Sequence, residues 1–127
     1  MELWVKVGEE KKKYQGSFRA VMESLVKDGK GKEVQILCIH APARERRRFK
    51  RELRWHDRDI LRTASAIARW FYLRDYRKIR RRIKELKKRA KYISKGEIMY
   101  CPKIMAQVKE LENKLSDIEK KLEELKV

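Results

Sequence analysis

The sequence predicts a mainly α (α+β) protein, with a small N-terminal β-α-β unit followed by long basic helices and an antiparallel coiled-coil helical hairpin. Three observations predict this class. Residues 1–43 contain two short segments with the alternating apolar residues of strands. Residues 43–95 contain no Gly or Pro, and their apolar residues recur at helical spacing. Heptad spacing then occupies two neighbouring segments joined by a short connection.

The first segment of the β-α-β unit is Leu3–Val7, in which every second residue is apolar, as in a strand. The polar segment Glu9–Gly16 predicts a loop. Ser17 is typical of a helix N-cap, and the apolar residues that follow it have helical spacing. The Gly signal within residues 28–31 predicts the end of that helix.

The second strand of this unit is predicted at Val34–His40, which is apolar enough to be largely buried. Two strands do not form a stable sheet alone. We therefore expect the unit, residues 1–43, to pack on the downstream helices or on the same strands of a second protomer.

A long helical region, residues 44–127, begins after Pro42, which suits the first turn of a helix. The apolar stripe falters near Trp55, and Asp57 is a possible N-cap for a new helix. If residues 57–94 form one helix, its length is about 55 Å at the usual rise per residue. Between residues 60 and 73 this helix is apolar nearly all round, which predicts that it packs on more than one side.

The helical hairpin is predicted to pair residues 72–94 with residues 103–126, joined by a turn that contains Gly96 and Pro102. The last segment has seven apolar residues at heptad spacing: Ile104, Val108, Leu111, Leu115, Ile118, Leu122 and Leu125. The preceding segment matches it with Tyr76, Ile79, Ile83, Leu86, Ala90 and Ile93. A parallel pairing of the last helix with its copy in a second chain is the alternative.

One register of the hairpin satisfies both the apolar residues and the charges beside them. It pairs Ile79 with Leu122, Ile83 with Ile118, Leu86 with Leu115, Arg80 with Glu119, and Lys87 with Glu112. On the other flank it brings Arg82 near Lys121 and Arg89 near Lys114. This flank is repulsive unless an anion binds there.

Positive charge is concentrated between Arg44 and Lys91, where 21 basic residues accompany six acidic ones. This stretch carries +15 of the net charge of +17. Like charges three and four residues apart destabilise a helix, so a compensating polyanion is expected. The abundance of Lys, Glu and Arg over Asn and Gln is also typical of hyperthermophile proteins.

We therefore expect an architectural or regulatory nucleic-acid-binding protein that uses an Arg-rich helical face, with double-stranded DNA favoured over RNA. The predicted binding residues are Arg44, Arg46, Arg47, Arg48, Lys50, Arg51, Arg54, Arg77, Lys78, Arg81, Arg82, Lys88 and Arg89. The alternative is a protein assembly module built on the coiled-coil hairpin, without a nucleic-acid role. Binding to an anionic membrane surface is disfavoured, because the basic helix already contributes its apolar face to the hairpin.

Aromatic residues accompany the basic ones. Phe71, Tyr72 and Tyr76 lie on the apolar stripe and are expected in the core, whereas Trp70 lies off it, between Arg69 and Arg74. Aromatic side chains beside arginines can stack on bases of single strands.

Metal binding and catalysis have little support in the sequence. Cys38, His40, His56 and Cys101 do not have the spacing of a compact zinc site. Two buried free thiols are expected, with a Cys38–Cys101 disulfide as the alternative. Asp57 and Asp59 would point to different faces of a helix. The sequence predicts no enzyme activity, no cofactor and no membrane span, and it favours an intracellular homodimer.

Overall fold

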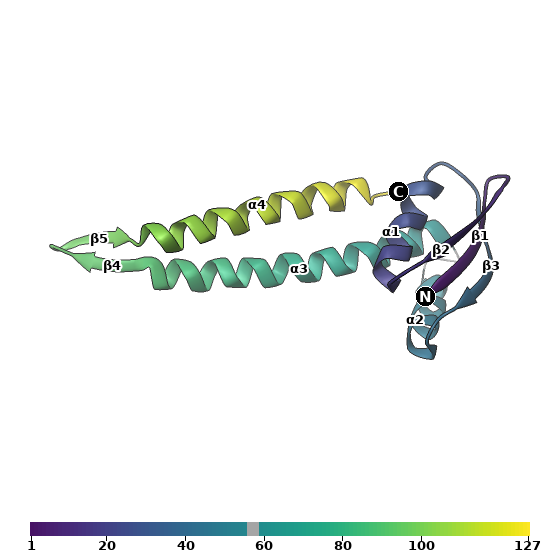
Figure 1. The fold of residues 1–127 in the computed structure, drawn as a ribbon, viewed down its shortest axis with the longest axis horizontal. Coiled ribbons are helices and arrows are strands. Elements are labelled where there is room, and N and C mark those ends of the chain that lie inside the picture. Colours follow the sequence, from purple (N-terminus) through teal and green to yellow (C-terminus); the bar gives the residue numbers. More distant parts are fainter. Residues whose placement is uncertain (56–58) are drawn as a thin grey trace. The chain divides into compact units, whose positions relative to one another are not determined.

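The computed structural model describes residues 1–55 and 59–127, without the side chains of Arg54 and Trp55. It has the predicted α+β class: an N-terminal antiparallel sheet with a helix, followed by long helices that pack antiparallel (Figure 1). The chain forms two compact units. The first contains Met1–Phe71 with Leu125–Val127, and the second contains Tyr72–Glu124.

The sheet of the first unit has three strands in the order β2-β1-β3, all antiparallel. These are β1 (Glu2–Val7), β2 (Glu10–Gln15) and β3 (Val34–His40). The prediction of a loop at Glu9–Gly16 is therefore wrong. A tight connection at Gly8, whose φ is 59°, returns the chain beside β1.

The charged strand β2 is held by polar contacts rather than by an apolar face. Tyr14 donates a hydrogen bond to the Asp28 carboxylate at 2.7 Å, and the Lys12 ammonium lies 3.7 Å from the same group. Burial, together with the neighbouring Asp28 carboxylate, raises the pKa of the Tyr14 hydroxyl well above its usual range. Apolar spacing could not reveal a strand fixed in this way.

Helix α1 (Phe18–Gly29) begins where predicted, because the Ser17 hydroxyl accepts a hydrogen bond from the Ala20 N–H at 3.1 Å. Its apolar side and the inner side of β1 form the core of the unit, with these residues buried: Leu3, Val5, Val7, Phe18, Val21, Met22, Leu25 and Val26. The helix ends at Gly29, where a Cβ would lie 2.8 Å from Leu61 Cδ1. A larger residue at this position would require the Leu61 side chain to move.

The sequence predicted that strand β3 is largely buried, and this prediction is wrong. Leu37 is 46% exposed, and Cys38 and His40 are also exposed. In an antiparallel sheet one face can lie on the core while the other meets water. On the neighbouring strand β1, Trp4 is 40% exposed and lies outside the core.

The helices α2 (Ala43–Trp55) and α3 (Ile60–Ala90) complete the first unit with the buried residues Phe49, Ala64, Ile67 and Ala68. Asp59 caps α3, because its carboxylate accepts a hydrogen bond from the Arg62 N–H at 3.0 Å. The predicted cap Asp57 lies outside the described residues. Ser65 is fully buried and donates a hydrogen bond to the Leu125 carbonyl at 2.5 Å.

In the second unit, α3 packs antiparallel against α4 (Pro102–Glu124), which confirms the helical hairpin within one chain (Figure 1). Its core contains Ile83, Leu86 and Val108, flanked by Ile79, Ile104, Leu111 and Leu115. The predicted ion pair between Lys87 and Glu112 is present at 3.7 Å. Glu119, predicted beside Arg80, accepts a hydrogen bond from the Tyr76 hydroxyl at 3.1 Å.

The connection between these helices differs from the prediction. Residues 91–100 form a β-hairpin, with β4 (Lys91–Ser94) paired to β5 (Glu97–Tyr100), in place of a helix end and a turn. Lys95 and Gly96 have φ angles of 52° and 75°, as in the two-residue turns that suit hairpins. Ile93, expected to end the heptad seam, is 77% exposed on β4.

We expect Phe49→Ala to lower the free energy of unfolding by about 3–5 kcal/mol, because the fully buried ring leaves a cavity in the first unit. Urea unfolding followed by circular dichroism measures this change. Lys50→Ala, an exposed neighbour on the same helix, is the control and should be nearly neutral. Equal destabilisation by the two variants would contradict this role of Phe49.

Leu86→Ala should lower the free energy of unfolding by about 2–5 kcal/mol, since Leu86 is buried in the helical hairpin. The same unfolding measurement applies, with the exposed Lys88→Ala as its control. A Leu86 variant as stable as the wild type would mean that the α3–α4 seam does not form.

Candidate nucleic-acid interface

The first set of predicted binding residues lies on α2. We use the name α2 cluster for its exposed members Arg44, Arg46, Arg47, Lys50 and Arg51. Phe49 turns toward the core, and at 100° per residue these five side chains lie within about half of the helix circumference. Within the described part of the chain, none of the five has an ion pair or hydrogen bond. The α2 cluster therefore presents uncompensated positive charge to solvent.

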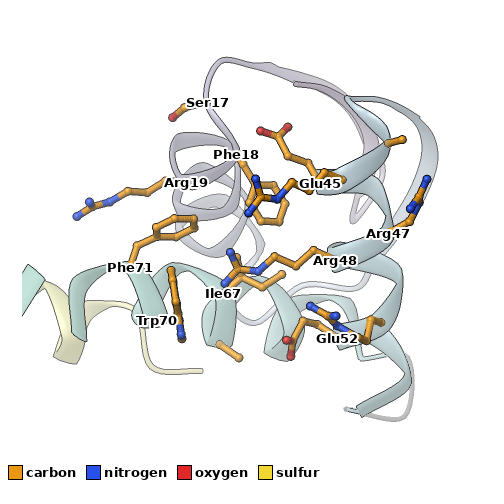
Figure 2. Close-up of a pocket in the computed structure, with 14 residues that line it drawn as sticks. Ser17, Phe18, Arg19, Glu45, Arg47, Arg48, Glu52, Ile67, Trp70 and Phe71 are labelled. Carbon is orange, nitrogen blue, oxygen red and sulfur yellow. The ribbon is translucent and has the colours of Figure 1, made fainter. Parts of the chain in front are cut away.

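Arg48 differs from the rest of α2, because its side chain is half-buried over aromatic rings. Its guanidinium lies 4.4 Å from the Trp70 ring centroid, 5.2 Å from that of Phe71 and 5.7 Å from that of Phe18 (Figure 2). Cation–π attraction at these distances holds the group in place. Arg48 thus ties α2 to the aromatic residues of α1 and α3.

A pocket of about 1160 Å³ lies beside Arg48, between the start of α1, residues 43–52 of α2 and residues 66–71 of α3. Figure 2 shows Arg48 reaching across from α2 toward Trp70 and Phe71 of α3. Five arginines and two glutamates line this pocket: Arg19, Arg44, Arg47, Arg48, Arg51, Glu45 and Glu52. Its lining is therefore both aromatic and net positive. We call it the Trp70 pocket.

Two side chains give the Trp70 pocket its particular chemistry. Trp70 is 43% exposed, and its ring centroid lies 5.1 Å from that of Phe71 with an interplanar angle of 84°. Glu45 Oε2 is shielded from solvent and has no hydrogen-bond partner within the described residues. The pocket thus offers an aromatic surface and an unused acceptor.

The second set of predicted binding residues lies on α3 in the second unit. Arg77, Arg81, Lys84 and Lys88 follow one another at intervals of four, three and four residues, which places them along one side of the helix. At 100° per residue this side is opposite the seam formed by Ile79, Ile83 and Leu86. All four are exposed and make no ion pair within the part of the chain that the structure describes. We call this row the α3 stripe.

The remaining predicted residues have different surroundings. Lys78 and Arg89 are exposed on the flank of the α3 stripe. Arg82 lies 3.5 Å from the Glu85 carboxylate, so part of its charge is already compensated. The side chain of Arg54 is outside the described residues.

Several residues that the sequence did not single out join these surfaces. Lys84 belongs to the α3 stripe, and its spacing from Arg77 and Arg81 was the signal that would have included it. Ser17, Arg19 and Glu45 line the Trp70 pocket. No sequence pattern links Glu45 of α2 to Ser17 and Arg19 at the start of α1, because the two helices are far apart in the sequence.

Within the described residues no cluster of three or more His, Cys, Asp or Glu side chains could hold a metal ion. Cys38 Sγ lies 3.3 Å from His40 Nε2. Cys38 and Cys101 are both free thiols, but Cys38 is exposed and Cys101 is partly exposed, so the prediction that both are buried is wrong. Among the described helices, none is long and apolar enough to cross a membrane.

Comparison with known proteins gives one full-length relative and no functional assignment. No protein-family model matches the chain, and no solved structure matches it. A protein of Aquifex aeolicus (strain VF5), described as an uncharacterized protein, is 80% identical over 127 residues, which is the whole of both chains. This chain belongs to the same protein family as that Aquifex aeolicus protein.

Proposed function

We propose that the protein binds nucleic acid, with double-stranded DNA favoured over RNA, in an architectural or regulatory role. The observation that carries this proposal is the α3 stripe, in which Arg77, Arg81, Lys84 and Lys88 are exposed without a nearby ion-pair partner in the described residues. Like charges at this spacing destabilise the helix that bears them. A polyanion would relieve this repulsion.

The dimensions of the α3 stripe suit a phosphate backbone. Its ends are separated by eleven residues, or about 16 Å along the helix axis. A DNA duplex carries one negative charge per about 1.7 Å of its axis, so four cations of this row meet several phosphates. The guanidinium groups of Arg77 and Arg81 can each bind a phosphate through two parallel hydrogen bonds.

The α2 cluster adds a second cationic surface, on the first unit. Its five side chains are exposed, and none has an ion-pair partner in the described residues. Contacts of arginine and lysine with phosphates position a protein on nucleic acid but do not read base sequence. Binding through these surfaces would thus have little sequence dependence, as an architectural role requires.

The helical setting of both surfaces supports DNA over RNA. The major groove of B-form DNA admits an α-helix, whereas that of A-form RNA is deep and narrow. Both the α2 cluster and the α3 stripe are carried by regular helices.

A second candidate function, protein assembly, is favoured by the β4–β5 hairpin. Its exposed apolar residues are Tyr92, Ile93, Ile98, Met99 and Tyr100. Cross-strand pairing places Ile93 and Ile98 together on one face, and Tyr92 and Met99 together on the other. A two-stranded hairpin has little stability alone, so a partner on either face would stabilise it. A second copy of this chain would make the protein a homodimer.

For the nucleic-acid proposal, we expect neutralising the α3 stripe to weaken duplex binding. The variant replaces Arg77, Arg81, Lys84 and Lys88 with Gln. Titration of a random-sequence DNA duplex at several salt concentrations should give a lower affinity for this variant. The slope of log affinity against log salt concentration should be shallower by up to about 3.6, because each phosphate contact contributes about 0.9 to its magnitude.

The matched control replaces Lys103, Lys109, Lys114 and Lys120 of α4 with Gln, which changes the net charge equally. These four lysines are exposed but are interspersed with acidic residues. The control should retain most of the affinity and slope. Equal losses in both variants would mean that only net charge matters and that the α3 stripe is not the contact surface.

For the assembly candidate, Ile93→Ser combined with Ile98→Ser should shift the protein toward monomer, because both side chains are exposed on one face of the hairpin. Sedimentation equilibrium at micromolar concentration measures the shift. Val127→Ser, an exposed apolar residue outside the hairpin, is the control. If the wild-type protein is monomeric, a second copy of this chain is not the partner of the hairpin, and the homodimer is contradicted.

A further inference from the structure

We infer that the Trp70 pocket holds an unpaired base of a DNA strand, stacked on Trp70 with its phosphate against the arginines of α2. This inference rests on the proposed binding of nucleic acid. The Trp70 pocket would recognise a base, whereas the α3 stripe would contact only phosphates. The pocket lies wholly within the first unit, and its volume is about 1160 Å³.

The stacking surface is the Trp70 ring system. The Arg48 guanidinium lies over this ring system, 4.4 Å from its centroid, and the Phe71 ring is nearly perpendicular to it. The Trp70 side chain nevertheless remains 43% exposed. A large aromatic side chain that is fixed by a cation and a neighbouring ring, yet open to solvent, is the kind of platform on which unpaired bases stack.

The charge of the pocket suits the phosphate attached to such a base. Arg44, Arg47 and Arg51 line the pocket and are exposed, with no ion-pair partner in the described residues. Arg19 contributes a further guanidinium, placed 5.9 Å from the Phe71 ring centroid. An anion with an aromatic body matches this combination better than a bare anion or an apolar group.

Glu45 indicates how the base would be distinguished. Its Oε2 atom is shielded from solvent and lacks a hydrogen-bond partner within the described residues, an arrangement that is unfavourable for an acceptor. The amino group of cytosine donates hydrogen bonds to carboxylates, whereas thymine has no amino group. We therefore expect an unpaired cytosine to be preferred over thymine.

A base in a duplex cannot use the Trp70 pocket in this way. Both of its faces are stacked on neighbouring bases, and the hydrogen-bonding groups of its pairing edge are taken by its partner strand. Occupancy of the pocket thus requires a strand end, a gap or a base turned out of the helix.

The test measures binding of a labelled trinucleotide of deoxycytidine and a labelled random-sequence duplex by fluorescence anisotropy at one salt concentration. Trp70→Ala should lower the affinity for the trinucleotide on the order of ten-fold, because stacking on the indole is lost. The affinity for the duplex should stay unchanged, because the phosphate contacts on α3 remain. Trp4→Ala is the matched control, since Trp4 is 40% exposed but lies on β1, outside the pocket.

Trp70→Leu keeps an apolar side chain against Arg48 and replaces the Ala variant if circular dichroism shows that the latter loses helicity. The wild type should also bind the deoxycytidine trinucleotide more tightly than the thymidine one, and inorganic phosphate should not compete at equal concentration.

Wild-type affinity for the trinucleotide in the Trp70 variants, or equal affinity for cytosine and thymine, would overturn the inference. If the duplex is still bound in a salt-dependent manner in that case, the proposed function stands without the pocket. If instead the wild type binds the trinucleotide through Trp70 and does not bind the duplex, the pocket inference stands and the duplex proposal fails.

Discussion

Mutual repulsion among the 21 basic residues of Arg44–Lys91 is the constraint on which the rest of the structure depends. Helices that carry so many like charges form only if apolar burial exceeds the repulsion. Phe49 provides that burial on α2, and Ile83 and Leu86 provide it on α3. Each cationic surface is therefore the outer side of a helix whose inner side is fixed in a core.

The structure compensates some of these charges and leaves others. Lys87 pairs with Glu112 across the helical hairpin, Arg82 pairs with Glu85 along α3, and Arg48 lies over aromatic rings. The α3 stripe and the α2 cluster have no such partners in the described residues. Because these cations are grouped on helix faces rather than scattered, they support the proposal of a polyanionic ligand.

The elements that the sequence revealed are those governed by local periodicity. The heptad spacing of Ile79–Leu86 and Ile104–Leu115 predicted the α3–α4 seam, and Ser17 predicted the N-cap of α1. Strand β2 was missed because its place depends on Tyr14 and Lys12 meeting Asp28, a tertiary contact. Strand β4 was missed because Ile93 fits both a heptad and a strand, and the Lys95–Gly96 turn decides between them. The Trp70 pocket combines three separate helices and has no signature in any one of them.

The most direct measurement of the central claim is the affinity of the wild-type protein for a random-sequence DNA duplex between about 50 and 200 mM salt. If the α3 stripe and the α2 cluster contact phosphates, the log–log plot should have a slope between about −4 and −8, since each phosphate contact contributes about −0.9. Absence of binding at the lower salt concentration, or an affinity independent of salt, would contradict the account.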